Sequence, residues 1–211
     1  MSDEARDNYR AALAATIDPP EAAAGPARLA ASVRRLVQVV TGSSAPDAVM
    51  EEVAEQVDAL VERLEPWSEP SRFPQADRLG GGMRGMFLTH PMIGITNPIS
   101  PGIVVRPTES GVRGEVVYTS QYEGPPNCVH GGFICAGFDA VLTMVAGSSG
   151  RGGLTKSLAV RYRKPTPLNT PLVYEGEVEA REERVTRITG RLLAGDVVCA
   201  EATAEVAYRP S

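Results

Sequence analysis

Apolar residues recur at spacings of three and four in the first third of the chain, which is the period of an amphipathic helix. One such pattern spans residues 26–41. A second spans residues 46–66, where Pro46 and Asp47 are typical of a helix start and Pro66 of a stop. The two predict a helical hairpin with these apolar faces: Leu29, Val33, Leu36, Val37 and Val40, then Val49, Val53, Val57, Leu60, Val61 and Leu64.

The composition changes between Glu65 and Gly85, where proline, serine, arginine and glycine dominate and three glycines follow one another at residues 80–82. Such a segment predicts a loop or linker. We therefore divide the chain into an N-terminal helical extension with its linker, residues 1–79, and a second domain, residues 80–211. For the extension we expect a role in packing or dimer support.

Beyond residue 102 the period changes to two, because β-branched and aromatic residues alternate with polar ones between glycine, proline and aspartate. A long helical pattern interrupts the strands only at residues 130–147. Two strands, one apolar helix and four further strands predict an α+β fold in which an antiparallel sheet packs on one helix. The predicted strands lie within residues 102–107, 112–122, 154–164, 172–182, 184–194 and 196–208.

The overall composition is typical of a globular protein with a sizeable core, since 43% of the 211 residues are hydrophobic and 22% are charged. The net charge of -5 argues against a chain-wide affinity for nucleic acid or for an anionic membrane. The N-terminus lacks the basic and apolar regions of a secretory signal, and no run of about 18 uncharged apolar residues occurs. We therefore expect a cytoplasmic protein that binds neither nucleic acid nor membranes.

Cysteine and histidine do not indicate a metal centre. The three cysteines, Cys128, Cys135 and Cys199, lack CxxC spacing, and their odd number argues against a disulfide framework. The two histidines, His90 and His130, lie far apart in the sequence without an HExxH pattern. We therefore expect no metal site.

Candidate chemistry gathers in one stretch, PPNCVHGGFICAGFDAVL at residues 125–142. A helix that begins near His130 leaves its first N–H groups without partners at the positive end of the helix dipole. Gly131 and Gly132 keep this backbone open to a ligand, although glycine is a poor helix former. The stretch predicts an oxyanion or phosphate site, and the alternative is close packing of the helix start against a strand.

Asp139 is the only charged residue of the apolar helix. Beside neighbours such as Phe138 and Leu142, a carboxylate costs free energy unless it has a partner. A role as general base or nucleophile would justify that cost, whereas the alternative is a carboxylate that is hydrogen-bonded or exposed at the flank of the helix. The nearby histidine and glycine pair favour the catalytic role.

The spacing of these groups predicts an assembly of two copies. Eight residues separate Gly131 from Asp139, which is roughly 12 Å along a helix axis. One helix cannot bring both groups to the same carbonyl, since each must lie about 3 Å from its target. An antiparallel second copy would place its Asp139 opposite Gly131, so we expect a two-fold dimer with two shared sites.

Three features together resemble the hotdog-fold acyl-CoA thioesterases, in particular the phenylacetate-degradation (PaaI) type. They are HGG at residues 130–132, the aspartate nine positions after the histidine, and GGLTKSLAVRYRKPTPL at residues 152–168. The resemblance covers about the C-terminal two-thirds of the chain. It implies an antiparallel β-sheet wrapped around a long central helix, and a homo-oligomer that is a dimer or a dimer of dimers.

The resemblance also implies roles for individual residues. Gly131, with Gly132 beside it, would offer backbone N–H to the thioester carbonyl. Asp139 of the partner would act as general base or nucleophile, and Thr155 would position the attacking water or the intermediate. No cofactor is implied, because coenzyme A is part of the acyl-CoA substrate.

The sequence departs from the family pattern at Gly124, where many members have an Asn or Gln that orients water or the carbonyl. Asn127 or Asn97 could supply a similar amide, or that role is absent. For His130 we expect ring hydrogen bonds that order the turn rather than acid or base chemistry.

If the substrate is an acyl-CoA, the sequence also offers candidates for the residues that bind it. Basic side chains on and just before the third predicted strand, with Ser157 among them, are candidates to bind the phosphates of coenzyme A, and the alternative is an ordinary solvated strand. The basic residues are Arg151, Lys156, Arg161, Arg163 and Lys164, and the candidate lining of the acyl pocket is Met83, Met86, Phe87, Phe133, Phe138 and Met144.

Two other functions compete with the thioesterase reading. Hotdog folds also host hydratases and dehydratases that pair a histidine with a carboxylate, but the context of His90 does not match their motif. A non-hydrolytic acyl-CoA-binding or regulatory protein is the second, and the missing amide at Gly124 favours it. Binding of acyl-CoA without hydrolysis would identify it.

Overall fold

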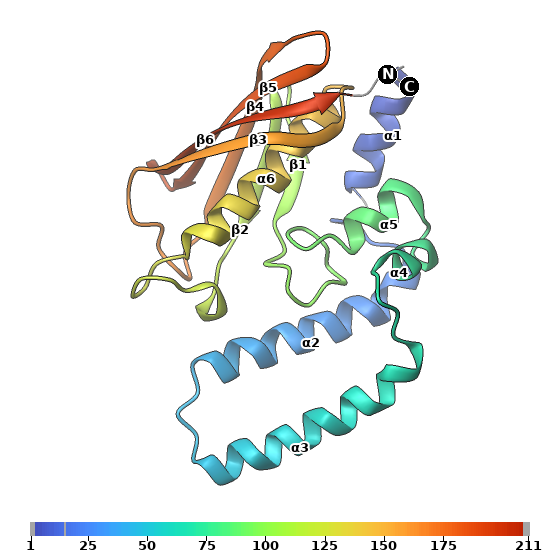
Figure 1. Cartoon of the computed structure of the whole chain (residues 1–211), viewed down its shortest axis with the longest axis vertical. Coiled ribbons are helices and arrows are strands. Elements are labelled where there is room, and N and C mark those ends of the chain that lie inside the picture. Colours follow the sequence, from blue (N-terminus) through green and yellow to red (C-terminus); the bar gives the residue numbers. More distant parts are fainter. Residues whose placement is uncertain (1–2, 15, 209–211) are drawn as a thin grey trace.

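The computed structural model describes residues 3–14 and 16–208 (Figure 1). The helices are α1 (Asp3–Ala14), α2 (Ala24–Thr41), α3 (Asp47–Leu64), α4 (Phe73–Arg78), α5 (Gly82–Leu88) and α6 (Gly131–Ser148), with 3-10 turns η1 (Glu21–Ala23), η2 (Glu65–Trp67) and η3 (Ser120–Tyr122). The strands are β1 (Val104–Pro107), β2 (Gly111–Val116), β3 (Gly153–Tyr162), β4 (Leu172–Arg181), β5 (Val185–Ala194) and β6 (Val197–Tyr208).

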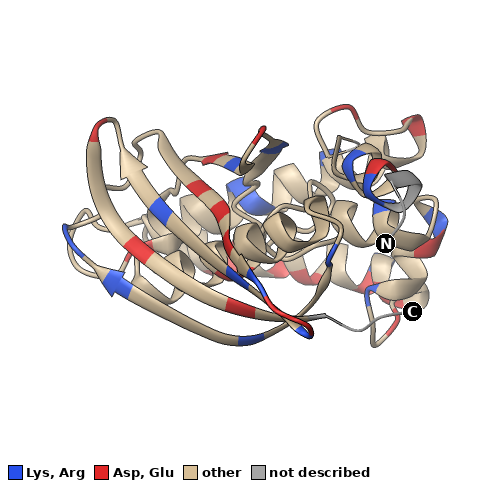
Figure 2. Ribbon diagram, turned by 90° about the horizontal axis from the view of Figure 1, so that it is seen from above, with Lys and Arg blue, Asp and Glu red and all other residues tan. Residues whose placement is uncertain are grey.

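The six strands form one antiparallel sheet in the order β1-β2-β4-β5-β6-β3. The sheet curves around α6, which lies along its inner face (Figures 1 and 2). Alternation along the strands directs small and apolar residues toward the helix, so that α6 lies close to the sheet. The α+β fold with one central helix is therefore confirmed, and five of the six predicted strand segments agree with the structure to within two residues at each end. The second segment, predicted for residues 112–122, ends as a strand at Val116, and its last three residues form η3.

Close packing of α6 depends on Gly137. A Cβ atom at this position would overlap the hydroxyl of Tyr174 and lie 2.9 Å from the hydroxyl of Tyr118. Both tyrosines are fully buried between the sheet and the helix. Neither ring has room to move away, because the core around them is already dense.

Replacing Gly137 by alanine is expected to lower the free energy of unfolding by about 2–3 kcal/mol, because overpacking displaces the buried rings. Urea unfolding of the wild type and the variant measures this loss. Gly25→Ala is the matched control, since a Cβ at Gly25 meets nothing within 4 Å. Equal stability of Gly137→Ala and Gly25→Ala would contradict the close packing.

The N-terminal part differs from the sequence prediction in two respects. The segment from Glu65 to Gly85, expected to be a loop or linker, forms η2, α4 and the start of α5. Its helices are short and have a proline or glycine within their first two residues, so their apolar pattern extends over too few residues to be detected. The prediction also had no helix before residue 26, whereas α1 packs through Tyr9, Ala12 and Leu13 into the core around α6.

By length and composition alone α6 could cross a membrane, which the sequence analysis did not expect of any segment. It is 18 residues long with a mean hydropathy of 1.4, and 61% of it is buried inside the protein. Because the sheet and α1 cover most of its surface, the helix has the properties of the core helix of a folded domain.

Candidate active site

One backbone N–H in the first turn of α6 is left without a hydrogen-bond acceptor among the described residues. His130 is the N-cap, and its Nδ1 accepts a hydrogen bond from the N–H of Gly132 at 3.0 Å. The carbonyl oxygen of His130 accepts from Phe133 at 3.0 Å and from Ile134 at 3.3 Å. The N–H of Gly131 has no acceptor among the described residues. His130 thus orders the turn through its ring, as predicted, and leaves a free donor at the positive end of the helix.

Gly131 also packs closely against β3. The hydroxyl of Tyr162 donates to the carbonyl oxygen of Gly131 at 2.9 Å, and a Cβ atom on Gly131 would lie 3.0 Å from that hydroxyl. The alternative explanation of the glycine pair, packing of the helix start against a strand, therefore holds as well. The two explanations are compatible, because Tyr162 contacts the carbonyl side of the residue and the free N–H lies on the other.

Two buried tyrosines lie beneath the same turn. The hydroxyls of Tyr118 and Tyr174 are 2.9 Å apart, and they lie 3.4 Å and 3.3 Å from the carbonyl oxygens of Phe133 and Ile134. Burial raises the pKa of the Tyr118 and Tyr174 phenols well above the usual value for tyrosine. Both hydroxyls therefore stay protonated and can donate hydrogen bonds. They hold the helix start in place and were not identified from the sequence. The available signal was a tyrosine at a helix-facing position of β4, between Leu172 and Gly176.

The structure explains the glycine at position 124. A Cβ atom there would lie 2.8 Å from Cα and 3.0 Å from Cβ of His130, so no larger residue fits. The amide of Asn97 is engaged within its own loop, since it donates to the carbonyl of Thr89 at 3.0 Å and accepts from the N–H of Ile99 at 3.1 Å. Asn127 is exposed, and its side-chain amide has no hydrogen bond with the described residues. Of the two asparagines proposed from the sequence, Asn127 has the amide free to bind.

Asp139 is exposed in the single chain, which corrects the expected apolar setting. It lies on the face of α6 that the sheet leaves uncovered, and its carboxylate makes no hydrogen bond or ion pair with any described residue. The prediction of an apolar environment was wrong because the neighbours of Asp139 along the chain point to the opposite side of the helix. Gly132 is exposed as well, so the candidate residues share an open surface.

Thr155 lies near Asp139 because of an irregularity in β3. Its Oγ1 is 3.1 Å from Oγ1 of Thr143, which in turn donates to the backbone carbonyl of Asp139 at 2.7 Å. The register of β3 against β6 shifts between Thr155 and Ser157. In a regular strand Thr155 and Leu158 would point to opposite faces, and the bulge at Lys156 turns Thr155 toward α6.

His90 faces the same region from the loop between α5 and β1. Its Nδ1 accepts from the N–H of Met92 at 3.1 Å, so the proton of the neutral ring is on Nε2. The pKa of His90 is lowered to about 4, mainly by burial and also by the positive charge of Arg72, whereas the carboxylate of Asp139 acts in the opposite direction. The sequence analysis found no catalytic context for His90, and only the fold brings it near Asp139.

His90 makes the stability of the protein depend on pH. Because its pKa is lowered to about 4 in the folded state, the unfolded chain, with a pKa of about 6.5, binds more protons between these values. Stability is therefore complete above pH 6.5 and falls as the pH drops, by about 2 kcal/mol between pH 7 and pH 5. Asparagine can still accept from Met92 but does not titrate, so His90→Asn is expected to remove this part of the loss in urea unfolding. An unchanged difference between the two pH values would contradict the shift.

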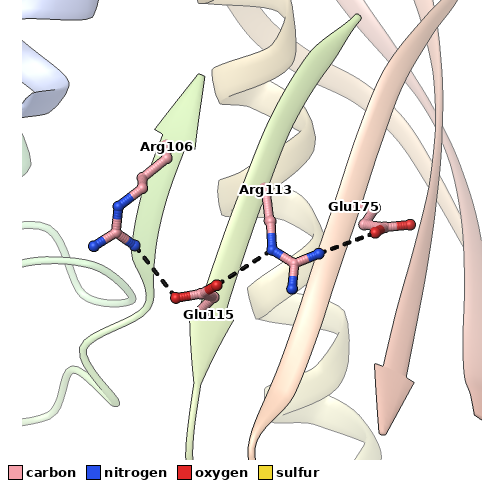
Figure 3. A network of polar contacts seen from close by, with 4 residues as sticks. All are labelled: Arg106, Arg113, Glu115 and Glu175. Carbon is pink, nitrogen blue, oxygen red and sulfur yellow. Dashed lines mark hydrogen bonds and ion pairs between the residues drawn. The ribbon is translucent and has the colours of Figure 1, made fainter. Parts of the chain in front are cut away.

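The outer face of the sheet carries rows of opposite charges (Figure 2). Figure 3 shows one row, in which Arg106 lies 3.3 Å from Glu115, and Arg113 lies 3.2 Å from Glu115 and 3.2 Å from Glu175. A groove of about 960 Å³ runs over this face, away from the open face of α6. Its residues are therefore separated from the candidate catalytic groups by the sheet itself.

Most of the candidate phosphate-binding residues are already engaged on the outer face. Lys156 lies 3.7 Å from Glu205, and Arg163 lies 2.6 Å from Glu201. Arg161 lines the groove and has no ion pair with a described residue. Ser157 is exposed and pairs with Glu205 across the strands. The solvated-strand alternative describes Lys156 and Arg163, and Arg151 donates to the carbonyl oxygen of Glu182 at 2.6 Å. Lys164, like Arg161, has no ion pair with a described residue.

The candidate acyl-pocket residues divide into two groups. Phe138 and Met144 are fully buried in the core, and Phe87 packs edge-on against Tyr9 at 5.3 Å, so these three serve the fold. Phe133 is only partly buried and contacts the ring of Tyr122 at 4.9 Å. It remains available to a ligand, together with the exposed Met83 and Met86.

Comparison with known proteins agrees with this geometry. Residues 127–201 match a family model described as the thioesterase superfamily. The crystal structure of a thioesterase superfamily protein superposes with a TM-score of 0.76 at 28% identity, over 86% of this chain and 90% of that protein. The chain is thus similar to proteins of the thioesterase superfamily, and its sheet and central helix form the hotdog fold.

Two further structures cover about half of this chain. A phenylacetic acid degradation-related protein from Ralstonia eutropha JMP134 is 24% identical with a TM-score of 0.47, over 51% of this chain and 85% of that protein. A hypothetical thioesterase from Streptococcus pneumoniae TIGR4, solved with coenzyme A, is 16% identical with a TM-score of 0.48, over 51% and 88%.

Proposed function

We propose that the protein hydrolyses acyl-CoA thioesters of the fatty or aromatic class to the free acid and coenzyme A, as a PaaI-type thioesterase. The similarity of residues 127–201 to the thioesterase superfamily, and of the fold to a thioesterase superfamily protein, supports this reaction class. The observation that carries the proposal is the N–H of Gly131, a donor without an acceptor among the described residues, at the positive end of an 18-residue helix. Such a donor stabilises the oxyanion that forms during attack on a thioester.

The proposed site combines two copies of the chain. The thioester carbonyl accepts from Gly131 of one copy, and Asp139 of the other copy takes a proton from water as the water oxygen bonds to the carbonyl carbon. Collapse of the tetrahedral intermediate breaks the carbon–sulfur bond, and the departing thiolate takes up a proton. Thr155 of the same chain as Asp139 orients the water, a proposal that the link through Thr143 supports, since two hydrogen bonds connect Thr155 with the backbone of Asp139. Direct attack by Asp139 is the alternative route to the same products.

The open face of α6 supports an arrangement with two copies. Gly132 and Asp139 are exposed in the single chain, although the helix around them is apolar. A second α6 running antiparallel would cover this face and bring the two catalytic groups together, in a dimer or a dimer of dimers. We propose that Asn127, whose side-chain amide has no hydrogen bond with the described residues, contacts the coenzyme A part of the substrate. Arg161 lies on the outer face of the sheet, away from the open face of α6, and is not assigned this role.

The test is release of the coenzyme A thiol from a panel of short, long and aromatic acyl-CoA esters by the purified protein. Hydrolysis of at least one ester class well above the buffer rate is the expected result. Binding of the esters, measured by calorimetry, without any thiol release would reject hydrolysis and favour the acyl-CoA-binding alternative. Neither binding nor release would reject both.

A further inference from the structure

The helices α2 and α3 leave a wide apolar surface uncovered. They extend away from the sheet, joined to each other by residues 42–46 (Figure 1). No residue of α3 is buried. Eight large apolar side chains of the pair are between 44% and 58% exposed: Leu29, Val37, Val39, Val40, Val49, Leu60, Val61 and Leu64. Exposed apolar side chains gathered on two consecutive helices of a folded chain mark an interaction site.

The spacing of these residues is that of a helical bundle. In α3, Met50, Val53, Val57, Leu60 and Leu64 follow one another at intervals of three and four, which is a heptad seam. Leu29, Val33, Leu36 and Val40 form the same pattern in α2. Val49 and Val61 widen the seam on both flanks, and a stripe of that width is typical of helices that contact two neighbours rather than one.

The two helices carry opposite charge. α2 has three arginines and no acid, a net charge of +3, whereas α3 has six acids against one arginine, a net charge of -5. No ion pair joins the two helices within the described part of the chain. Pairing of α3 with another α3 would bring like charges together, while pairing of α3 with α2 of another copy joins opposite charges.

The pair is anchored to the segment that forms the candidate site. Arg34 of α2 donates to the carbonyl of Asn97 at 3.0 Å, and the hydroxyl of Ser120 donates to the carbonyl of Gln38 at 3.2 Å. Ser120 begins η3, whose last residue, Tyr122, accepts from the N–H of His130 at 2.8 Å. These bonds use one side of α2 and leave its apolar stripe free.

We propose that the apolar surface of α2 and α3 is covered by the same surface of a second copy of this chain, so that the four helices form an antiparallel bundle with each α3 against the other copy's α2. The bundle completes both seams and neutralises the charge of each helix with that of its new neighbour. This interface is separate from the open face of α6, and it does not require that the protein be a hydrolase.

Substitutions on α3 test the interface. Val61→Glu places a charge in the proposed seam and is expected to raise the dissociation constant of this contact on the order of a hundredfold. Ala59→Glu adds the same charge on the exposed polar side of α3 and is the matched control. Sedimentation equilibrium should show that Val61→Glu loses one step of assembly that the wild type and Ala59→Glu retain. Equal assembly of all three proteins would overturn the proposal, as would a wild type that is a monomer.

A cross-link identifies the contact itself. Val37 is replaced by the photoreactive p-benzoylphenylalanine, and equal amounts of ¹⁵N-labelled and unlabelled protein are mixed before irradiation. The expected product joins a labelled to an unlabelled chain through a peptide from residues 47–64. Cross-links found only within one chain, or only to the sheet of the second copy, would overturn the proposal whether or not the protein hydrolyses acyl-CoA.

Discussion

Replacing Asp139 by asparagine is expected to lower kcat for thioester hydrolysis by about two to four decades, the usual contribution of a general base. Asparagine has the same size as aspartate but cannot take a proton from water. Because Asp139 is exposed and its carboxylate has no partner among the described residues, the substitution leaves the fold intact. The measurement is the steady-state rate of thiol release, with binding of the ester measured in parallel.

Asp196→Asn is the control for this substitution. Asp196 is exposed in the turn between β5 and β6, so the same chemical change occurs far from α6. Normal turnover by Asp196→Asn, together with ester binding and a normal unfolding curve for Asp139→Asn, would assign the loss to chemistry. Near-normal turnover by Asp139→Asn would exclude Asp139 as base or nucleophile.

Replacing Gly131 by proline is expected to lower kcat by about two to three decades, because it removes one oxyanion donor. Gly131 is the first residue of α6, where proline is well tolerated. The preceding residue, His130, has φ -63 and ψ 134, which is the conformation that a following proline requires. The substitution therefore deletes an N–H that has no acceptor among the described residues, with little change to the helix.

Gly131→Ala distinguishes the effect of losing the N–H donor from the effect of adding a Cβ atom beside Tyr162. Alanine keeps the N–H but, like proline, adds a Cβ atom 3.0 Å from the hydroxyl of Tyr162. If the N–H stabilises the oxyanion, Gly131→Pro loses far more activity than Gly131→Ala. Equal losses in the two variants would attribute the effect to displacement of Tyr162 and would remove Gly131 from the proposed machinery.

Mixing the two inactive variants tests whether the site is shared. A heterodimer of Asp139→Asn and Gly131→Pro would have one site with both groups intact and one with neither, if each site takes Gly131 from one copy and Asp139 from the other. Reassembly of equal amounts after mild unfolding should then recover up to about a quarter of wild-type activity. No recovery, with heterodimers present by mass, would place both groups of a site on the same chain.

The elements that could be predicted from the sequence are those with a long and regular pattern. The hairpin helices, the six strand segments and the helix that begins after His130 each repeat one period over many residues. The segment around Phe73 and Met83 could not be predicted, because helices of six or seven residues repeat their period less than twice. The helix α1 was missed because few of its residues are apolar at core positions: among its side chains that the structure describes, Tyr9, Ala12 and Leu13 join the core.

The features of the candidate site likewise fall into those that a local sequence pattern predicts and those that it does not. The helix start at His130, the glycine pair beside an N–H without an acceptor among the described residues, and the distance along the helix to Asp139 follow from the sequence alone, because all three are local consequences of helix geometry. Only the tertiary structure decided that Asp139 is exposed, that a bulge turns Thr155 toward it, and that His90 faces it from a distant loop. These depend on contacts between segments far apart in the sequence, where burial and the register of the strands, rather than local pattern, set which side chains meet.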